Sequence, residues 1–161
     1  MSLKTRAARA RSRYLKHPTD RGLRYYLTLK AKLGKWDDRY CRYYSVPTGV
    51  NAATKRFIMR GFASGLVVTA TTNGVHAPGS YHGKHQAADM GLRSGEVGTV
   101  TGLKKMERFQ RAEYSRRGKT QPLELLGPIN AMCVLRGSPT VLGEGSTLET
   151  QHDNHVHGAF A

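Results

Sequence analysis

The chain has 161 residues, of which 39% are hydrophobic and 8% aromatic, a composition typical of one ordinary globular domain with a modest core. Its formal net charge is +15, because 26 Lys and Arg residues stand against 11 Asp and Glu residues. Two cysteines, Cys41 and Cys133, are too few for a disulfide framework, and we expect both to be buried thiols. No segment approaches the roughly 18 consecutive apolar residues that a membrane span needs.

The positive charge is concentrated in the first part of the sequence. Residues 1–60 carry 16 basic and 3 acidic side chains, whereas residues 61–161 carry 10 and 8. A field of this sign attracts polyanions, so it favours nucleic acid, anionic membrane surfaces and anionic cell-wall polymers as partner classes. The basic stretch MSLKTRAARARSRYLKH is followed by no apolar segment, which predicts that the chain carries no signal peptide and stays in the cytoplasm until another factor releases it.

Helical patterns dominate the first part of the chain. Residues 2–16 contain helix-forming Ala, Arg and Lys with little apolar stripe, which predicts a solvated or partner-bound arm. Leucines and tyrosines in residues 20–33 recur at helical spacing. Asn51 is expected to cap an amphipathic helix within residues 51–65.

Strand patterns follow, on either side of one long helix. The helix is expected over residues 103–119, because apolar side chains recur there at helical period and two arginines precede a glycine at its end. The expected strands lie within residues 65–74, 123–126, 131–135, the hairpin 136–145, and 148–160. The first of these is apolar and β-branched, which predicts a buried strand. The pattern predicts an α+β fold with a small antiparallel sheet flanked by helices.

Five of the seven histidines fall into two short clusters, SYHGKH and HDNHVH. Because side chains alternate along a strand, His155 and His157 are expected on one face and Val156 on the other. A catalytic zinc ion needs three protein ligands and an open position for water. His82 and Asp89 are candidates for one nitrogen and one carboxylate oxygen, and one histidine of the last strand would complete a His-Asp-His set. No H-E-x-x-H occurs, which excludes the helical zincin arrangement.

The two clusters resemble those of a known family. SYHGKHQAAD resembles the S-x-H-x-x-G-x-A-x-D motif of the D-alanyl-D-alanine carboxypeptidase-like zinc peptidases, with matches at Ser80, His82, Ala87 and Asp89. HVH is similar to the H-x-H of the wider superfamily that includes lysostaphin-type endopeptidases, penicillin-insensitive murein endopeptidases and hedgehog signalling domains. The resemblance covers about residues 50–161, so we expect a basic helical region over 1–49 and a zinc peptidase-like domain over 50–161.

The resemblance implies a metal site with known ligands. Zinc would be held by His82, Asp89 and His157, on the small sheet. One departure from the motif is His85, which stands where the family prefers glycine. A second is Asn154, which replaces a carboxylate that many members carry three residues before the last ligand.

The same likeness implies catalytic residues beside the metal. His152 lies five residues before the last ligand, a spacing similar to that of the murein endopeptidases, and His155 would line the site. The general base remains open between His152 and His155, with Asp153 as the second choice.

The function that the resemblance implies is zinc-dependent hydrolysis of peptide bonds in bacterial peptidoglycan. A small basic enzyme of this type resembles a phage endolysin, which is kept in the host cytoplasm until its release to the cell wall, with peptidoglycan and anionic wall polymers as partners. In an alternative interpretation, the basic N-terminal region binds nucleic acid or docks into a virion or another assembly, and the metal site is not catalytic. A third interpretation is a zinc-binding interaction domain without hydrolysis.

Overall fold

The computed structural model describes residues 1–16, 22, 25–26, 29, 49–71, 76 and 78–161. The chain forms two compact units, Met1–Val46 and Pro47–Ala161. In the first unit, α1 (Leu3–Lys16) is a helix. The helix expected over 20–33 and the thiol of Cys41 fall largely outside the described residues. No helix in the described part of the chain is long and apolar enough to cross a membrane.

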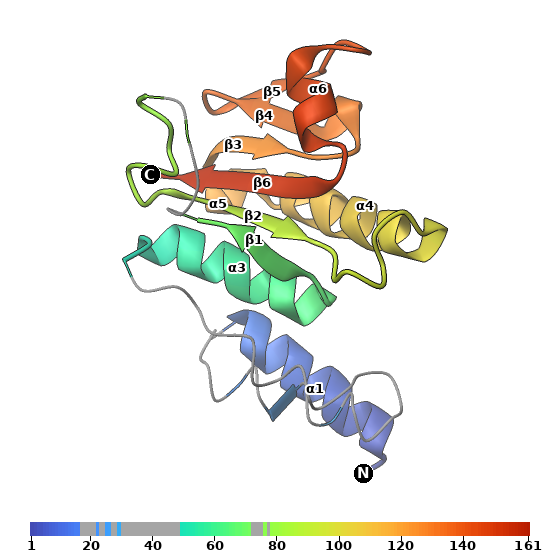
Figure 1. Cartoon of the computed structure of the whole chain (residues 1–161). Helices are drawn as coiled ribbons and strands as arrows, with labels where there is room; N and C mark the ends of the chain where they lie inside the picture. Colours follow the sequence, from blue (N-terminus) through green and yellow to red (C-terminus); the bar gives the residue numbers. More distant parts are fainter. Residues whose placement is uncertain (17–21, 23–24, 27–28, 30–48, 72–75, 77) are drawn as a thin grey trace. The chain divides into compact units, whose positions relative to one another are not determined.

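The second unit is built on a sheet of six strands. These are β1 (Val67–Ala70), β2 (Ala87–Gly91), β3 (Pro122–Leu126), β4 (Cys133–Leu135), β5 (Ser138–Thr140) and β6 (His155–Phe160). Their spatial order is β1-β2-β6-β3-β4-β5, and every neighbouring pair is antiparallel (Figure 1). The last strand therefore lies inside the sheet, between β2 and β3. The predicted α+β class with a small antiparallel sheet is confirmed.

Four helices and one 3-10 turn accompany the sheet: α3 (Ala52–Ser64), α4 (Val100–Ser115), α5 (Arg117–Thr120), η2 (Asn130–Met132) and α6 (Thr147–His152). As predicted, Asn51 is the N-cap of α3, and its side chain accepts a hydrogen bond from the Thr54 amide. The α4 helix begins three residues earlier than expected, because the Thr99 hydroxyl caps it by accepting from the Gly102 amide.

The two faces of β6 have different neighbours. Phe160 lies with its ring centroid 5.4 Å from that of Phe57 on α3, and Phe57 lies 5.2 Å from Phe109 on α4. Gly158 permits this close approach, since a Cβ there would lie 2.6 Å from the Phe57 ring. Because side chains alternate along a strand, the helices cover the face of β6 that carries Gly158 and Phe160. His157 belongs to the opposite face.

The strand within 65–74 is less buried than its sequence predicts. β1 spans only Val67–Ala70, and its side chains are half-buried or exposed. The reason is its position, because β1 is an edge strand of the sheet and has β2 as its one neighbour there. Its β-branched residues reflect strand propensity more than burial.

The strand predicted over 148–160 is wrong in its first half. Residues Thr147–His152 form α6, and β6 begins only at His155. Ser146 caps this helix by accepting from the amide of Glu149, three residues on, which is the spacing of a capping box. His152 therefore stands on the last turn of a helix and not on the strand.

A buried ion pair joins α3 to α4. Arg60 donates from Nε and Nη2 to the two carboxylate oxygens of Glu113, both at 2.7 Å. The two side chains are 10% and 3% exposed. A bidentate pair of this kind fixes the relative orientation of the helices, and it leaves a costly buried charge if one partner is removed.

We expect Arg60→Met to lower the free energy of unfolding by up to about 3–5 kcal/mol, because buried Glu113 then loses its bidentate partner and keeps the longer contact with Arg116 Nε, at 3.7 Å. Combining Arg60→Met with Glu113→Leu removes both charges and should recover most of that loss. Urea unfolding measures both effects, with Arg56→Met on the exposed side of the same helix as a control that changes stability by less than about 0.5 kcal/mol. A double variant no more stable than Arg60→Met contradicts this account.

Candidate metal centre

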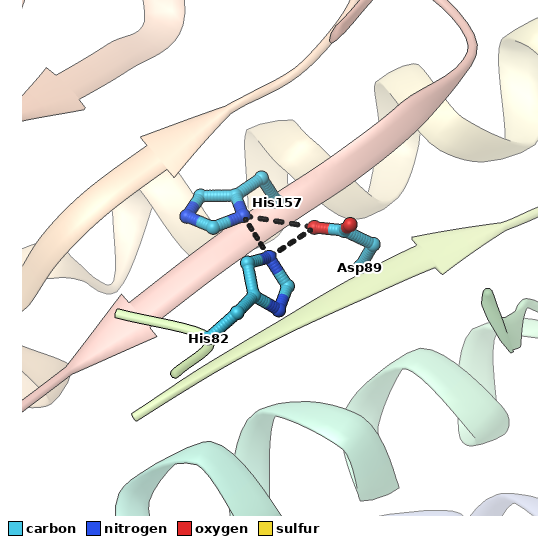
Figure 2. Close-up of side chains that lie close together, drawn as sticks. All are labelled: His82, Asp89 and His157. Atoms are coloured by element: carbon cyan, nitrogen blue, oxygen red, sulfur yellow. Dashed lines mark hydrogen bonds and ion pairs between the residues drawn. The ribbon is translucent and has the colours of Figure 1, made fainter. Parts of the chain in front are cut away.

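Three side chains from distant parts of the sequence converge on the open face of the sheet (Figure 2). In the β2–β6 pairing Asp89 lies directly opposite His157, so both side chains stand on one face. His82 reaches them from the turn before β2. His157 Nδ1 lies 2.8 Å from Asp89 Oδ1, and His82 Nε2 lies 3.3 Å from the same oxygen and 3.2 Å from His157 Nδ1.

The outward nitrogen of each imidazole has an acceptor of its own. His82 Nδ1 lies 2.5 Å from the Thr71 carbonyl oxygen, and His157 Nε2 lies 3.1 Å from Glu124 Oε2. Carbonyl and carboxylate oxygens only accept, so these two nitrogens carry the hydrogens. The atoms that face one another are Nε2 of His82, Nδ1 of His157 and a carboxylate oxygen of Asp89. Without a metal ion, a hydrogen on His157 Nδ1 is donated to Asp89; a metal ion in the place of that hydrogen would be bound by all three atoms.

The residues fit a metal ion. Zinc bonds of about 2.0–2.1 Å at tetrahedral angles require ligand atoms about 3.3 Å apart, and two of the three observed separations are 3.2 and 3.3 Å. His82 and His157 are each only 5% exposed, which fixes both rings. Among the described residues, His82, Asp89 and His157 are the group that could hold a metal ion.

The electrostatics of the cluster favour positive charge. Burial raises the pKa of Asp89, but hydrogen bonds from His157 and His82 outweigh it and hold the pKa far below its ordinary value. Burial lowers the pKa of His157, yet hydrogen bonds to Asp89 and Glu124 raise it to about 9. Without a metal ion, His157 is thus a cation between two carboxylates, and an ion that binds Nδ1 takes the place of a proton.

Two further histidines lie beside these three. His155 Nε2 is 3.7 Å from Asp89 Oδ1, and the ring centroid of His152 is 5.0 Å from that of His155 and 5.6 Å from that of His157. Burial lowers the pKa of both His152 and His155, so both are neutral bases at neutral pH. His152 Nδ1 donates to the Leu148 carbonyl at 2.7 Å, which leaves its Nε2 as the basic atom.

Other residues singled out in the sequence lie away from the cluster. Asp153 is exposed at the C-cap of α6, and its role as a second base stays a prediction. His85 is exposed in a turn with a φ of 60°, in the left-handed region, which explains why a glycine suits this position. Ser80 accepts from the His82 backbone amide at 3.2 Å and so shapes the turn that presents this ligand.

The structure adds two residues that the sequence did not reveal. Glu124 reaches His157 from β3, and the His76 ring stacks on His82 with centroids 4.3 Å apart and planes 3° from parallel. Neither belongs to a motif, because Glu124 contacts a residue 33 positions further along the chain, and the stacking of His76 on His82 follows no regular helix or strand spacing. The sequence signal that could have singled out Glu124 is its place as the one charged residue in the apolar strand pattern LELL.

His82→Ala, Asp89→Ala and His157→Ala should each weaken binding of Zn²⁺ or Co²⁺ by more than the roughly 10–100-fold that loss of an outer partner costs. Isothermal titration calorimetry measures the affinity, and amide NMR spectra report whether each variant is folded. His85→Gly is the matched control, because it removes a neighbouring imidazole and relieves a left-handed backbone; it should bind like the wild type. A ligand variant that keeps full affinity removes that residue from the site.

Comparisons with known proteins found no match to this chain among protein-family models, curated proteins or solved structures. The zinc peptidase family therefore remains a prediction from the motifs at residues 80–89 and 155–157. The observed part of that prediction is a cluster of His82, Asp89 and His157 on one sheet, with the chemistry to hold a metal ion.

Proposed function

We propose that the chain is a zinc-dependent peptidase that hydrolyses amide bonds in bacterial cell-wall peptides, as an endolysin does. The observation that carries the proposal is the convergence of two imidazoles and one carboxylate, with two more neutral imidazoles beside them. His155 Nε2 lies 3.7 Å from Asp89 Oδ1, and the ring centroid of His152 lies 5.6 Å from that of His157. Three protein ligands are the number that catalytic zinc sites use, whereas structural sites use four. The adjoining histidines supply the base that such a site needs.

Zinc is the metal that we propose, because it accepts imidazole nitrogen and carboxylate oxygen together at three protein positions. Bound zinc supplies Lewis acidity, which makes a water molecule acidic and polarises a carbonyl group. The chain's own residues do the rest. His82, Asp89 and His157 would hold the ion, and the burial of the two imidazoles restricts the movement of their rings.

His152 is the general base in this proposal, and His155 assists it. The bond from His152 Nδ1 to the Leu148 carbonyl orients the ring and leaves Nε2 free to take a proton from water and return it to the leaving amine. His155 Nδ1 donates to the side-chain oxygen of Asn154 at 2.8 Å, and its Nε2 lies 3.7 Å from Asp89 Oδ1, beside the candidate ligands. In this proposal His155 donates from Nε2 to the oxygen of the scissile carbonyl once it has taken up a proton.

The proposed substrate is the peptide part of peptidoglycan. Support comes from the likeness of SYHGKHQAAD and HVH to peptidases of that substrate, and from a net charge of +15, which attracts an anionic cell wall. In this proposal the protein is held in the host cytoplasm until another factor releases it to the wall.

The deciding experiment incubates purified peptidoglycan with wild-type protein, chelator-treated protein and His152→Ala, and identifies the released fragments by mass spectrometry. New amine ends should appear with the metal-loaded wild type and identify the bond. His152→Ala should keep its metal and lose rate by about 100- to 10,000-fold, the contribution of a general base. Glu144→Ala, at an exposed position with no role in the candidate site, is the control and should stay active. Intact peptidoglycan in the presence of metal-loaded wild type contradicts the proposal.

A second candidate function, binding of nucleic acid through α1, is favoured by the distribution of charge on this helix. Its sequence LKTRAARARSRYLK contains six basic residues and no acidic one. Lys4, Arg6, Arg9, Arg11 and Arg13 are exposed, whereas Ala7 and Ala10 are buried. We propose that α1 presents a basic face to a polyanion, whether or not the metal site is catalytic.

This second function predicts salt-dependent binding of duplex DNA, measured by fluorescence anisotropy. The variant with Lys4, Arg9 and Arg13 all changed to Gln should bind less tightly and reduce the log–log salt slope by up to about 2.7. A control variant removes the same charge from exposed positions of the other unit, Lys104, Arg108 and Lys119. Equal losses of affinity in both variants would assign the binding to net charge and not to α1. Adding purified teichoic acid as a competitor of DNA tests whether α1 also binds a cell-wall polymer.

A further inference from the structure

We propose that Glu124 is a positioning residue of the metal centre: its carboxylate accepts the Nε2 hydrogen of His157 and so orients the ring with Nδ1 toward Asp89 and His82, where a metal ion would bind. The proposal rests on the metal site and does not require that the protein be a peptidase.

Strand pairing places Glu124 beside the ligand. β3 pairs with β6, and in its register Glu124 lies opposite Ala159, two residues along β6 from His157. Positions two apart share a face, so Glu124 and His157 stand on the same side of the sheet as diagonal neighbours. Glu124 Oε2 then lies 3.1 Å from His157 Nε2.

Glu124 acts from outside the ligand set. It contacts Nε2, whereas Asp89 and His82 contact Nδ1, so the imidazole ring lies between Glu124 and the other two ligands. The carboxylate therefore does not reach the ion, and its effect passes through the ring. Its side chain is 26% exposed, against 6% for His157, which places it at the border of the buried cluster.

A carboxylate in this place has two effects on the ligand. It favours a hydrogen on Nε2, because an acceptor-only group needs a donor there, and Nδ1 is then the nitrogen that can exchange its hydrogen for a metal ion. It also makes Nδ1 a stronger donor to the metal, as carboxylate partners of metal-bound histidines do. The other imidazole, His82, has the Thr71 carbonyl in the corresponding position, which is a backbone group and a neutral one.

Replacing Glu124 should weaken the metal site without removing a ligand. We expect Glu124→Leu to lower the affinity for Zn²⁺ by about 10–100-fold at constant pH, measured by competition with a chromogenic chelator. Glu124→Gln keeps an acceptor oxygen of the same reach and should recover part of the loss. The control Glu144→Leu makes the same chemical change at an exposed position and should bind like the wild type.

The tautomer is the readout that separates positioning from a general structural role. With both proteins metal-free and at a pH where the His157 ring is neutral, long-range ¹H–¹⁵N NMR should show less hydrogen on Nε2 in Glu124→Leu than in the wild type, because Asp89 at Nδ1 then has no competing carboxylate at Nε2. Amide spectra of the same samples show whether the variant is folded. If Glu124→Leu is not folded, the same measurement is made on Glu124→Gln.

The outcomes distinguish this proposal from the proposed function. Wild-type affinity and an unchanged tautomer in both folded variants overturn the role of Glu124 and leave the peptidase intact. Failure of the wild type to bind Zn²⁺ or Co²⁺ overturns both. Normal metal binding with the expected loss in Glu124→Leu, but no cleavage of peptidoglycan, supports Glu124 and overturns the peptidase.

Discussion

The antiparallel pairing of β2 with β6 is the constraint on which the candidate site depends. It sets Asp89 opposite His157, although 68 residues separate them in the chain. The pairing of β6 with β3 then brings Glu124 to the other side of the same imidazole. Since side chains alternate along a strand, a slip of one residue in either pairing would turn these groups to the opposite face of the sheet. The register of the strand pairs therefore determines which side chains meet at the candidate site.

The helix-covered face holds this register in place. Asn51, at the start of α3, donates from its side chain to the Phe160 carbonyl and from its backbone to the His85 carbonyl. Thr54 donates its hydroxyl to the Gln86 carbonyl. These bonds fasten the turn that carries His82 and the end of β6 to one helix terminus, so the ligands stand on supported backbone. A metal centre needs such support, because a shift of a fraction of an ångström changes its geometry.

The sequence allowed prediction where a local signal carries the information. The Asn51 cap and the α+β class follow from short patterns in consecutive residues, and the resemblance of two short motifs to a known family singled out His82, Asp89 and His157, which the fold brings together. The α6 helix was missed because Thr147–His152 is a single turn and a half with little apolar periodicity, and its signal was the Ser146–Glu149 capping pair. Glu124 and His76 were out of reach for another reason, since their contacts follow from strand register and from the fold of a loop, which no pattern of neighbouring residues encodes.

The interior position of β6 also has a consequence for folding. Its neighbours β2 and β3 hold no ladder with each other, so the sheet is divided into β1–β2 and β3–β4–β5 until β6 is inserted. Contacts over 68 and 75 residues must form together, which predicts slow and cooperative assembly. A partly folded chain would lack both a continuous sheet and the ligand set. A metal ion held by His82, Asp89 and His157 would join β2 and the turn before it to β6, so its binding would stabilise the chain in which these two strands are paired.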